Sequence, residues 1–91
     1  MSFDQQESID HARRDLAQRL DLAEGEVAEQ SVLAADFPDA ALGAPLEDEM
    51  SAQIITPGWR IVLAARGQTY EYRASQNQLR LYNFKGDNYR V

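Results

Sequence analysis

The apolar residues near the start of the chain recur at steps of three and four positions, which is the period of a helix with one apolar side. This apolar stripe consists of Ile9, Ala12, Leu16 and Leu20. Asp4 and Glu7 precede it with the D-x-x-E spacing of an N-terminal capping box. The pattern predicts a helix that begins after Asp4, ends near Leu20 to Asp21, and packs on something flat such as a sheet.

The second half of the chain alternates between apolar and polar positions, as strands with one buried face do. One predicted face carries Trp59, Ile61, Leu63 and Ala65, and the other carries Arg60, Val62, Ala64 and Arg66. Arg66-Gly67 then predicts a tight two-residue reversal. Positions 69–74 alternate again, so the two segments are expected to form an antiparallel hairpin.

A further alternating segment predicts a last strand over Leu79 to Phe84. Its predicted faces are Leu79 with Leu81, and Arg80 with Tyr82 and Phe84. The residues that follow, 85–91, are mostly polar, and we expect them to form a frayed tail.

The segments before the hairpin carry weaker signals. Residues 27–36 predict a strand that ends sharply at Phe37-Pro38-Asp39. Residues 38–52 read as a long connection, and long connections in small domains often carry function. Gln53-Ile54-Ile55 predicts a short strand, and Thr56-Pro57-Gly58 suits a type II turn in which Gly58 takes a positive φ.

Together these elements predict an α+β fold, in which one N-terminal helix packs on an antiparallel sheet of about four strands. Ninety-one residues are expected to form a single domain, 1–91, with one modest core. The chain has no Cys, which excludes disulfides, thiolate metal sites and a nucleophilic Cys. No signal peptide or membrane-spanning run is recognisable, so we expect a cytoplasmic protein.

Charge is spread unevenly along the chain. The net charge is −6, yet residues 1–49 hold 13 acidic and 3 basic residues, whereas residues 50–91 hold 2 acidic and 6 basic residues. The opposite signs could attract within one fold, or a basic sheet face could meet an acidic partner. Net acidity argues against bulk affinity for nucleic acid, which needs clustered Lys and Arg.

Three motifs resemble a family. They are P-D-A-A-L-G-A-P at 38–45, Q-I-I-T-P-G-W-R-I at 53–61 and Y-E-Y at 70–72. Over about residues 12–74 the chain is similar to a small bacterial domain of unknown function that commonly reads W-P-D-x-S-L-G-C-P, Q-x-x-T-P-G-Y-R-I-x-L and Y-x-Y. Phe37 and Ala44 stand where that family usually has Trp and Cys, so no thiol-dependent role carries over. The resemblance implies a fold rather than an activity.

The order helix, strand, turn and hairpin also resembles cystatins, which insert a Q-x-x-x-G-like turn into protease clefts. The corresponding segment here runs from Gln53 to Trp59 and is one residue longer than that motif. A turn that only folds the hairpin is the simpler interpretation, and a protease inhibitor is the alternative.

Candidate chemistry is sparse. His11 is the only His, and an exposed side chain hydrogen-bonded to Glu7 is the simpler interpretation. The sequence gives no sign of the catalytic pocket that general-base work would need. The acidic run Glu47-Asp48-Glu49 lacks the spacing of a cation loop, and a solvated loop is the simpler interpretation. No phosphate-binding, nucleotide-binding or hydrolase motif occurs. We therefore expect no enzyme activity, no cofactor and no metal.

The remaining candidates are aromatic and basic. Trp59, Tyr70 and Tyr72 are expected as core under the helix, or else as an outward aromatic patch. Arg60, Arg73 and Arg80 alternate away from the apolar face; they either pair with Glu71 and the acidic helix or form a basic stripe beside Tyr82. The sequence-based hypothesis is a non-enzymatic protein-interaction or regulatory module. Its expected binding residues are Arg60, Arg73, Arg80, Tyr82, Leu42 and Trp59.

In this hypothesis the sheet face and the 38–52 connection bind a protein partner or a second copy of the chain. No membrane partner is expected. Single-stranded nucleic acid on the arginine-bearing face is the alternative, since Tyr82 and Phe84 are predicted to share that face.

Overall fold

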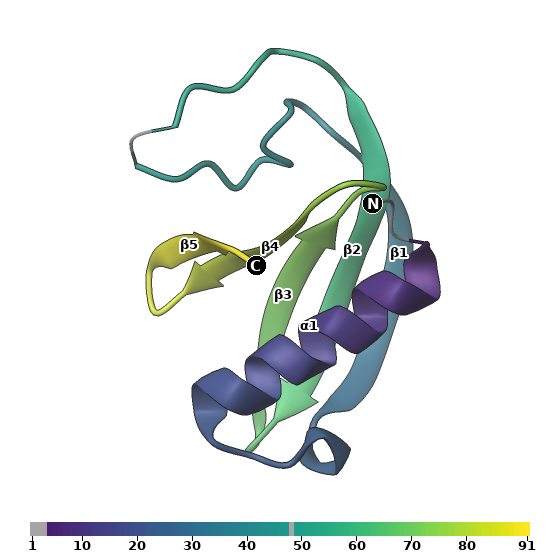
Figure 1. Ribbon diagram of the computed structural model, residues 1–91, viewed down its shortest axis with the longest axis vertical. Coiled ribbons are helices and arrows are strands. Elements are labelled where there is room, and N and C mark those ends of the chain that lie inside the picture. Colours follow the sequence, from purple (N-terminus) through teal and green to yellow (C-terminus); the bar gives the residue numbers. More distant parts are fainter. Residues whose placement is uncertain (1–3, 48) are drawn as a thin grey trace.

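The computed structural model describes residues 4–47 and 49–91. One helix lies across one face of a five-stranded antiparallel sheet with strand order β1-β2-β3-β4-β5 (Figure 1). The elements are the helix α1 (Gln5–Leu20), a 3-10 turn η1 (Glu24–Glu26), and the strands β1 (Ala28–Phe37), β2 (Thr56–Ala65), β3 (Gln68–Ala74), β4 (Leu79–Phe84) and β5 (Asp87–Arg90). The predicted α+β class is confirmed, with five strands rather than about four.

The helix begins and ends where its sequence signals place it. The Asp4 carboxylate accepts a hydrogen bond from the Glu7 amide at 2.7 Å, and the Glu7 carboxylate accepts one from the Asp4 amide at 3.2 Å. This reciprocal capping box satisfies two N–H groups that the first turn leaves unpaired. At the other end Asp21 adopts a left-handed φ of 56° and stops the helix.

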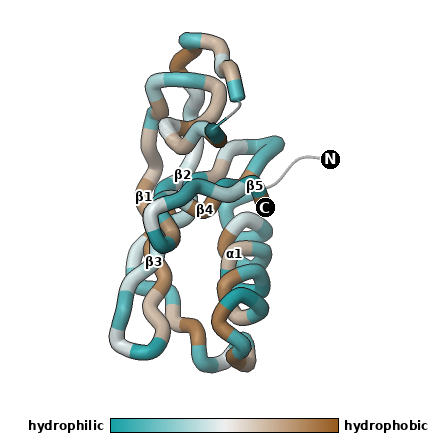
Figure 2. The backbone as a smooth tube through the Cα atoms, turned by 90° about the vertical axis from the view of Figure 1, so that its left-hand side faces the viewer, coloured by the Kyte–Doolittle hydropathy of each residue, from teal (hydrophilic) through white to brown (hydrophobic). Residues whose placement is uncertain are grey.

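The core lies between α1 and the sheet, and Figure 2 shows the helix standing on one side of the strands. Three residues of the predicted stripe, Ile9, Ala12 and Leu16, are each 4% exposed or less, and Leu20 is partly buried. They pack with Ile61, Leu63 and Tyr72 of the hairpin, which are fully buried. The Tyr72 hydroxyl donates a 2.7 Å hydrogen bond to Asp15 on the helix. Burial, together with this neighbouring carboxylate, raises the pKa of Tyr72 well above its ordinary value.

Two hairpins share the same turn chemistry. Arg66 and Gly67 both take positive φ, 53° and 75°, as predicted for a two-residue reversal. Lys85 and Gly86 do the same at 54° and 91° and join β4 to β5. The frayed tail expected over 85–91 is therefore wrong: the second turn folds the end of the chain back as a strand.

Phe84 lies on a different face from the one predicted. Asn83 has a left-handed φ of 52°, and the β4–β5 register shifts between Leu81 and Phe84. This irregularity reverses the alternation, so Phe84 packs on the core beside Tyr70, with ring centroids 5.8 Å apart. The Arg19 guanidinium lies 5.9 Å from the Phe84 ring centroid.

The start of β2 also departs from expectation. The strand predicted at Gln53-Ile54-Ile55 is absent, and the turn predicted at Thr56-Pro57-Gly58 lies within β2. The reason is pairing with β1, which continues to Phe37 opposite Thr56. Gly58 has no positive φ. Its small size is needed instead because a Cβ there would lie 1.9 Å from the Ala74 carbonyl oxygen.

Candidate functional site

The long connection between β1 and β2, residues 38–55, folds back on the sheet face that points away from α1, which we call the open face. Its first turn is organised by Asp39, whose carboxylate accepts hydrogen bonds from the Ala41 amide at 2.9 Å and the Gly43 amide at 3.0 Å. Leu42 lies in this turn with a φ of 59° and is fully buried. The first turn of the connection is thus held by hydrogen bonds within the connection itself.

Arg73 of β3 binds this turn to the sheet. Its Nη1 donates to the carbonyl oxygens of Leu42 at 3.1 Å and Gly43 at 3.0 Å, and its Nε donates to Glu71 at 2.7 Å. The guanidinium carbon lies 3.7 Å from the Tyr82 ring centroid. Arg73 is therefore bound on three sides within its own chain.

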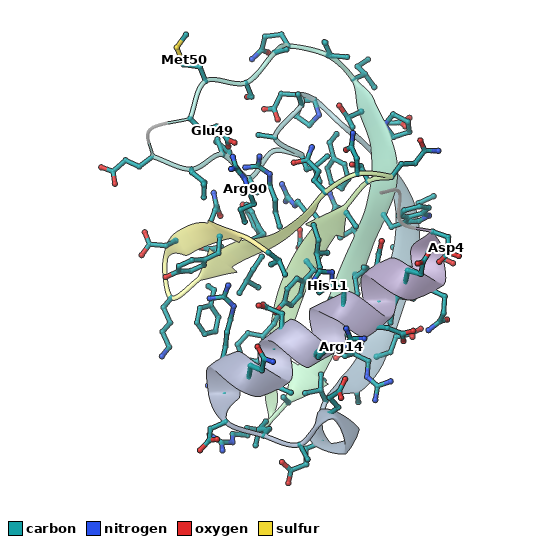
Figure 3. All side chains as sticks on the ribbon, in the orientation of Figure 1. Asp4, His11, Arg14, Glu49, Met50 and Arg90 are labelled. Carbon is teal, nitrogen blue, oxygen red and sulfur yellow. The ribbon has the colours of Figure 1, made fainter. Side chains whose placement is uncertain are left out.

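Arg80 of β4 holds the later part of the connection. The residue is only 4% exposed, and its Nη2 donates to Glu49 at 2.7 Å while its Nη1 donates to Glu49 and to the Ala44 carbonyl. Arg90 of β5 donates to the same carboxylate at 2.6 Å. Figure 3 shows Glu49 and Arg90 facing each other between the connection and β5.

These contacts set the charge state of Glu49. The hydrogen bond from Arg80 is the largest cause, and it lowers the pKa of Glu49 to about 2 against the opposing effect of burial. Hydrogen bonds from the Leu46 amide and Arg90 lower the pKa further. Glu49 is therefore ionised at neutral pH, and its contacts give it a structural role. Asp48, its neighbour in the acidic run, lies outside the described residues.

The predicted binding residues are thus divided between two faces. Arg73, Arg80 and Tyr82 lie on the strands under the connection, and Leu42 lies in the connection, where its carbonyl accepts from Arg73. Arg60 shares the open face and pairs with Glu71 at 3.4 Å. The sequence predicts either ion pairs within the chain or a basic stripe for these arginines. Arg60 and Arg73 both pair with Glu71, as the first alternative expects. Arg80 pairs instead with Glu49 of the connection.

Trp59 lies apart from that cluster, on the face that α1 covers. It pairs with Ala34 of β1 and with Ala74 of β3. Beyond the helix it contributes to a pocket of about 450 Å³. The described residues that line the pocket are Ala34 of β1, residues 56–59 of β2, and residues 75–77, which follow β3. None of the described residues in this lining is charged.

The edge strand β1 carries a surface that the sequence did not identify. Its ten residues form one edge of the sheet, and Leu33 at its centre is 61% exposed. Residues 30–35, Q-S-V-L-A-A, carry no charge. The opposite edge, β5, has only four residues and includes Asp87 and Arg90. Long uncharged edge strands are uncommon because they invite pairing with another chain.

Two further apolar residues are exposed where the connection enters β2. Ile54 is 60% exposed and Ile55 is 72% exposed, while Met50 at 98% points away from the rest of the protein (Figure 3). The signal for β1 was present in the uncharged run of residues 30–35. Which strand would lie at an edge depends on the strand order, and this the sequence pattern does not give.

The other candidate sites and functions receive little support from the part of the chain that the structure describes. No group of three or more His, Asp or Glu side chains there is placed to hold a metal ion. Among the described residues no helix has the length and apolar character needed to cross a membrane. The Gln53-to-Trp59 turn on which the protease-inhibitor alternative rests is replaced by coil and strand. The nucleic-acid alternative loses Phe84 from the arginine-bearing face.

A family model described as Domain of unknown function (DUF8738) matches residues 9–82, and the chain belongs to this family. No curated protein and no solved structure matches the chain.

Proposed function

We propose that this domain of unknown function is a non-enzymatic protein-interaction module that binds an extended segment of a partner protein along the outer edge of β1. The observation that carries the proposal is the contrast between the two sheet edges. β1 offers ten residues with an uncharged centre, whereas β5 is short and charged. A partner strand added to such an edge gains main-chain hydrogen bonds, and side-chain pockets make it specific.

The hydrogen-bonding groups available at this edge follow from the register. Ala65 and Gln68 flank the two-residue turn, so they form the closing pair and Ala64 turns its amide toward β1. By the same alternation, Leu33 and Ala35, opposite Arg60 and Gly58, direct their amides toward β2.

Val32, Ala34 and Asp36 therefore direct their amide and carbonyl groups outward. Three outward-facing residues at alternate positions match the repeat of an incoming strand. The bulge between Glu29 and Ser31 ends this regular stretch, so the receptive part of the edge runs over residues 31–37.

Charge favours a partner protein over a second copy of the chain. The half of the sequence that contains β1 holds 13 acidic and 3 basic residues, and Glu29 and Asp36 lie on β1 itself. Two copies paired through β1 would bring these acidic segments together, and like charges across a strand pair are destabilising. The partner segment we propose is accordingly apolar with basic residues.

The open face beside β1 extends this surface. The connection covers the end of the face near Arg73 and Arg80. Beside the edge, Leu33 is 61% exposed and the Arg60 side chain is 44% exposed. The sheet face and the connection proposed from the sequence thus border the edge of β1. In this arrangement the arginines under the connection position it, and Arg60 is the arginine near a bound segment.

The proposal is tested at one position with two substitutions. Ala34→Pro removes the outward N–H, while Ala34→Ser keeps it and adds little volume. Each variant is used to purify binding proteins from the native host, after circular dichroism has verified its fold. We expect Ala34→Ser to retain the proteins bound by the wild type and Ala34→Pro to lose them. Equal binding by both folded variants would contradict strand addition.

We also propose that the family is bacterial and that the protein is cytoplasmic. The motif pattern expected of a bacterial family is consistent with the family match over residues 9–82. A cytoplasmic location is consistent with the absence of a membrane-spanning helix in the described chain.

A further inference from the structure

We infer that the pocket beside Trp59 binds a bulky apolar side chain of the added strand, and that Asp36 binds a Lys or Arg two residues from it. This inference rests on the proposed function, because it specifies the side chains that such a partner segment carries. It predicts a recognition pattern of basic, any residue, apolar.

The position of Ala34 connects the pocket to the edge. Ala34 lines the pocket, pairs with Trp59 across the β1–β2 ladder, and lies on the edge strand itself. Its side chain is small and exposed, so it leaves room for a larger neighbour on the adjoining strand. A side chain opposite Ala34 on an added strand would lie beside it on the same face of the sheet. It would thus enter the space next to the indole ring.

The pocket selects an uncharged side chain. The lining residues that the structure describes are all neutral, and Trp59 and Pro57 supply apolar surface. A volume of about 450 Å³ is ample for a Leu, Phe or Trp side chain. Transfer of a charged group into this lining would cost desolvation with no opposite charge to compensate. Gln76 and Asn77 at the margin offer hydrogen bonds to the main chain or to a polar edge of an aromatic ring.

Asp36 supplies the charge requirement. It lies two residues from Ala34, so its side chain is on the same face, and it is exposed. Asp36 makes no ion pair with another described residue, in contrast to Glu49 and Glu71. Asp36 is paired with Pro57, a residue of the pocket, and its carboxylate on an acidic strand attracts a cationic side chain.

The spacing of the partner motif follows from the strand geometry. Residues opposite Ala34 and Asp36 are two positions apart in either strand direction, and only their order changes. The residue next to the pocket side chain, opposite Leu33, faces the open side and meets exposed apolar surface. The partner segment therefore reads basic-x-apolar-apolar when antiparallel to β1, and apolar-apolar-x-basic when parallel.

The experiment selects phage-displayed random nonapeptides against the wild-type domain. The enriched sequence is then synthesised, and its affinity is measured by titration. Because Trp59 is the only Trp, its fluorescence reports directly on occupation of the pocket. We expect enrichment of the basic-x-apolar-apolar pattern or its reverse, a change in Trp59 emission on binding, and a loss of about tenfold in affinity when the pocket residue of the peptide is changed to Ala.

Two variants separate the components. Asp36→Lys is expected to reverse the charge preference, so that peptides with an acidic residue at the basic position are enriched. Trp59→Leu is expected to weaken the preference for a large apolar side chain while peptides still bind. Arg66→Lys, in the distant β2–β3 turn, is the control and should select the same peptides as the wild type.

The outcomes distinguish this inference from the proposed function. Peptides that lose binding to Ala34→Pro but show no preference opposite Ala34 and Asp36 would overturn the inference and leave strand addition in place. Failure to enrich any peptide would overturn both. A dimer detected by light scattering and abolished by Ala34→Pro would show that a second copy occupies the edge, and would overturn the choice of partner.

Discussion

The carboxylate of Glu49 joins the guanidinium groups of Arg80 and Arg90, and so connects the middle of the long connection to the last two strands. Arg80 is 4% exposed, whereas Arg90 is 61% exposed, so the inner ion pair carries most of the stabilisation. This relationship keeps the connection on the open face and leaves the β1 side of the sheet uncovered.

Glu49→Gln is expected to lower the free energy of unfolding by about 2 kcal/mol, because it leaves the buried Arg80 guanidinium without its countercharge. Urea denaturation followed by circular dichroism measures this change. Glu47→Gln is the matched control, since Glu47 is exposed two residues earlier. Equal stability of the two variants would contradict the structural role of Glu49.

Glu49 also predicts a dependence of stability on pH. Its folded pKa of about 2 lies below its ordinary value of 4.5, so its contribution is fully present above pH 4.5 and is lost as the pH falls toward 2. The loss amounts to at most about 3 kcal/mol. Unfolding free energies measured between pH 6 and pH 2 should fall more steeply for the wild type than for Glu49→Gln. Parallel curves would show that Glu49 does not cause the decline.

Gly58→Ala is expected to destabilise the fold by about 2 kcal/mol or more, because the added Cβ would lie 1.9 Å from the Ala74 carbonyl oxygen and would force β2 and β3 apart. Gly25→Ala is the control: no atom within 4 Å would meet its Cβ, and its φ is not positive. Thermal unfolding of both variants makes the comparison. An unchanged melting temperature for Gly58→Ala would refute the close approach.

Tyr89→Ala tests whether β5 is part of the core. The Tyr89 ring centroid lies 4.7 Å from the Arg19 guanidinium carbon and 6.1 Å from the Phe84 ring centroid, and Tyr89 packs against the buried residues. We expect a loss of about 2 kcal/mol in unfolding free energy. Asp87→Asn is the control in the same strand. A frayed end, as residues 85–91 first suggested, would give no loss from either change.

Local sequence signals predicted much of this fold. The capping residues Asp4 and Glu7 placed the helix, and Arg66-Gly67 placed the first hairpin, because each depends on neighbours in the chain. Lys85-Gly86 carries the same turn signal, but the segment after it, residues 87–91, is short and mostly polar. Its strand therefore read as a tail.

The candidate site was less predictable for a physical reason. Arg73 donates to the carbonyl oxygens of Leu42 and Gly43, groups that every residue possesses, so no side-chain pattern marks the contact. Alternation placed Arg73 and Arg80 on the open face, but only the path of the connection shows that it covers them. The exposure of β1 likewise depends on the order of the strands in the sheet.

The central claim is that β1 accepts a strand at its outer edge, and amide hydrogen exchange by NMR tests it most directly. In the free protein, the amides of Val32 and Ala34 should exchange rapidly, and those of Leu33 and Ala35 slowly, because only the second pair faces β2. Addition of the selected basic-x-apolar-apolar peptide should protect Val32 and Ala34 and leave Leu33 and Ala35 unchanged. Binding of the peptide without new protection at Val32 and Ala34 would contradict the account.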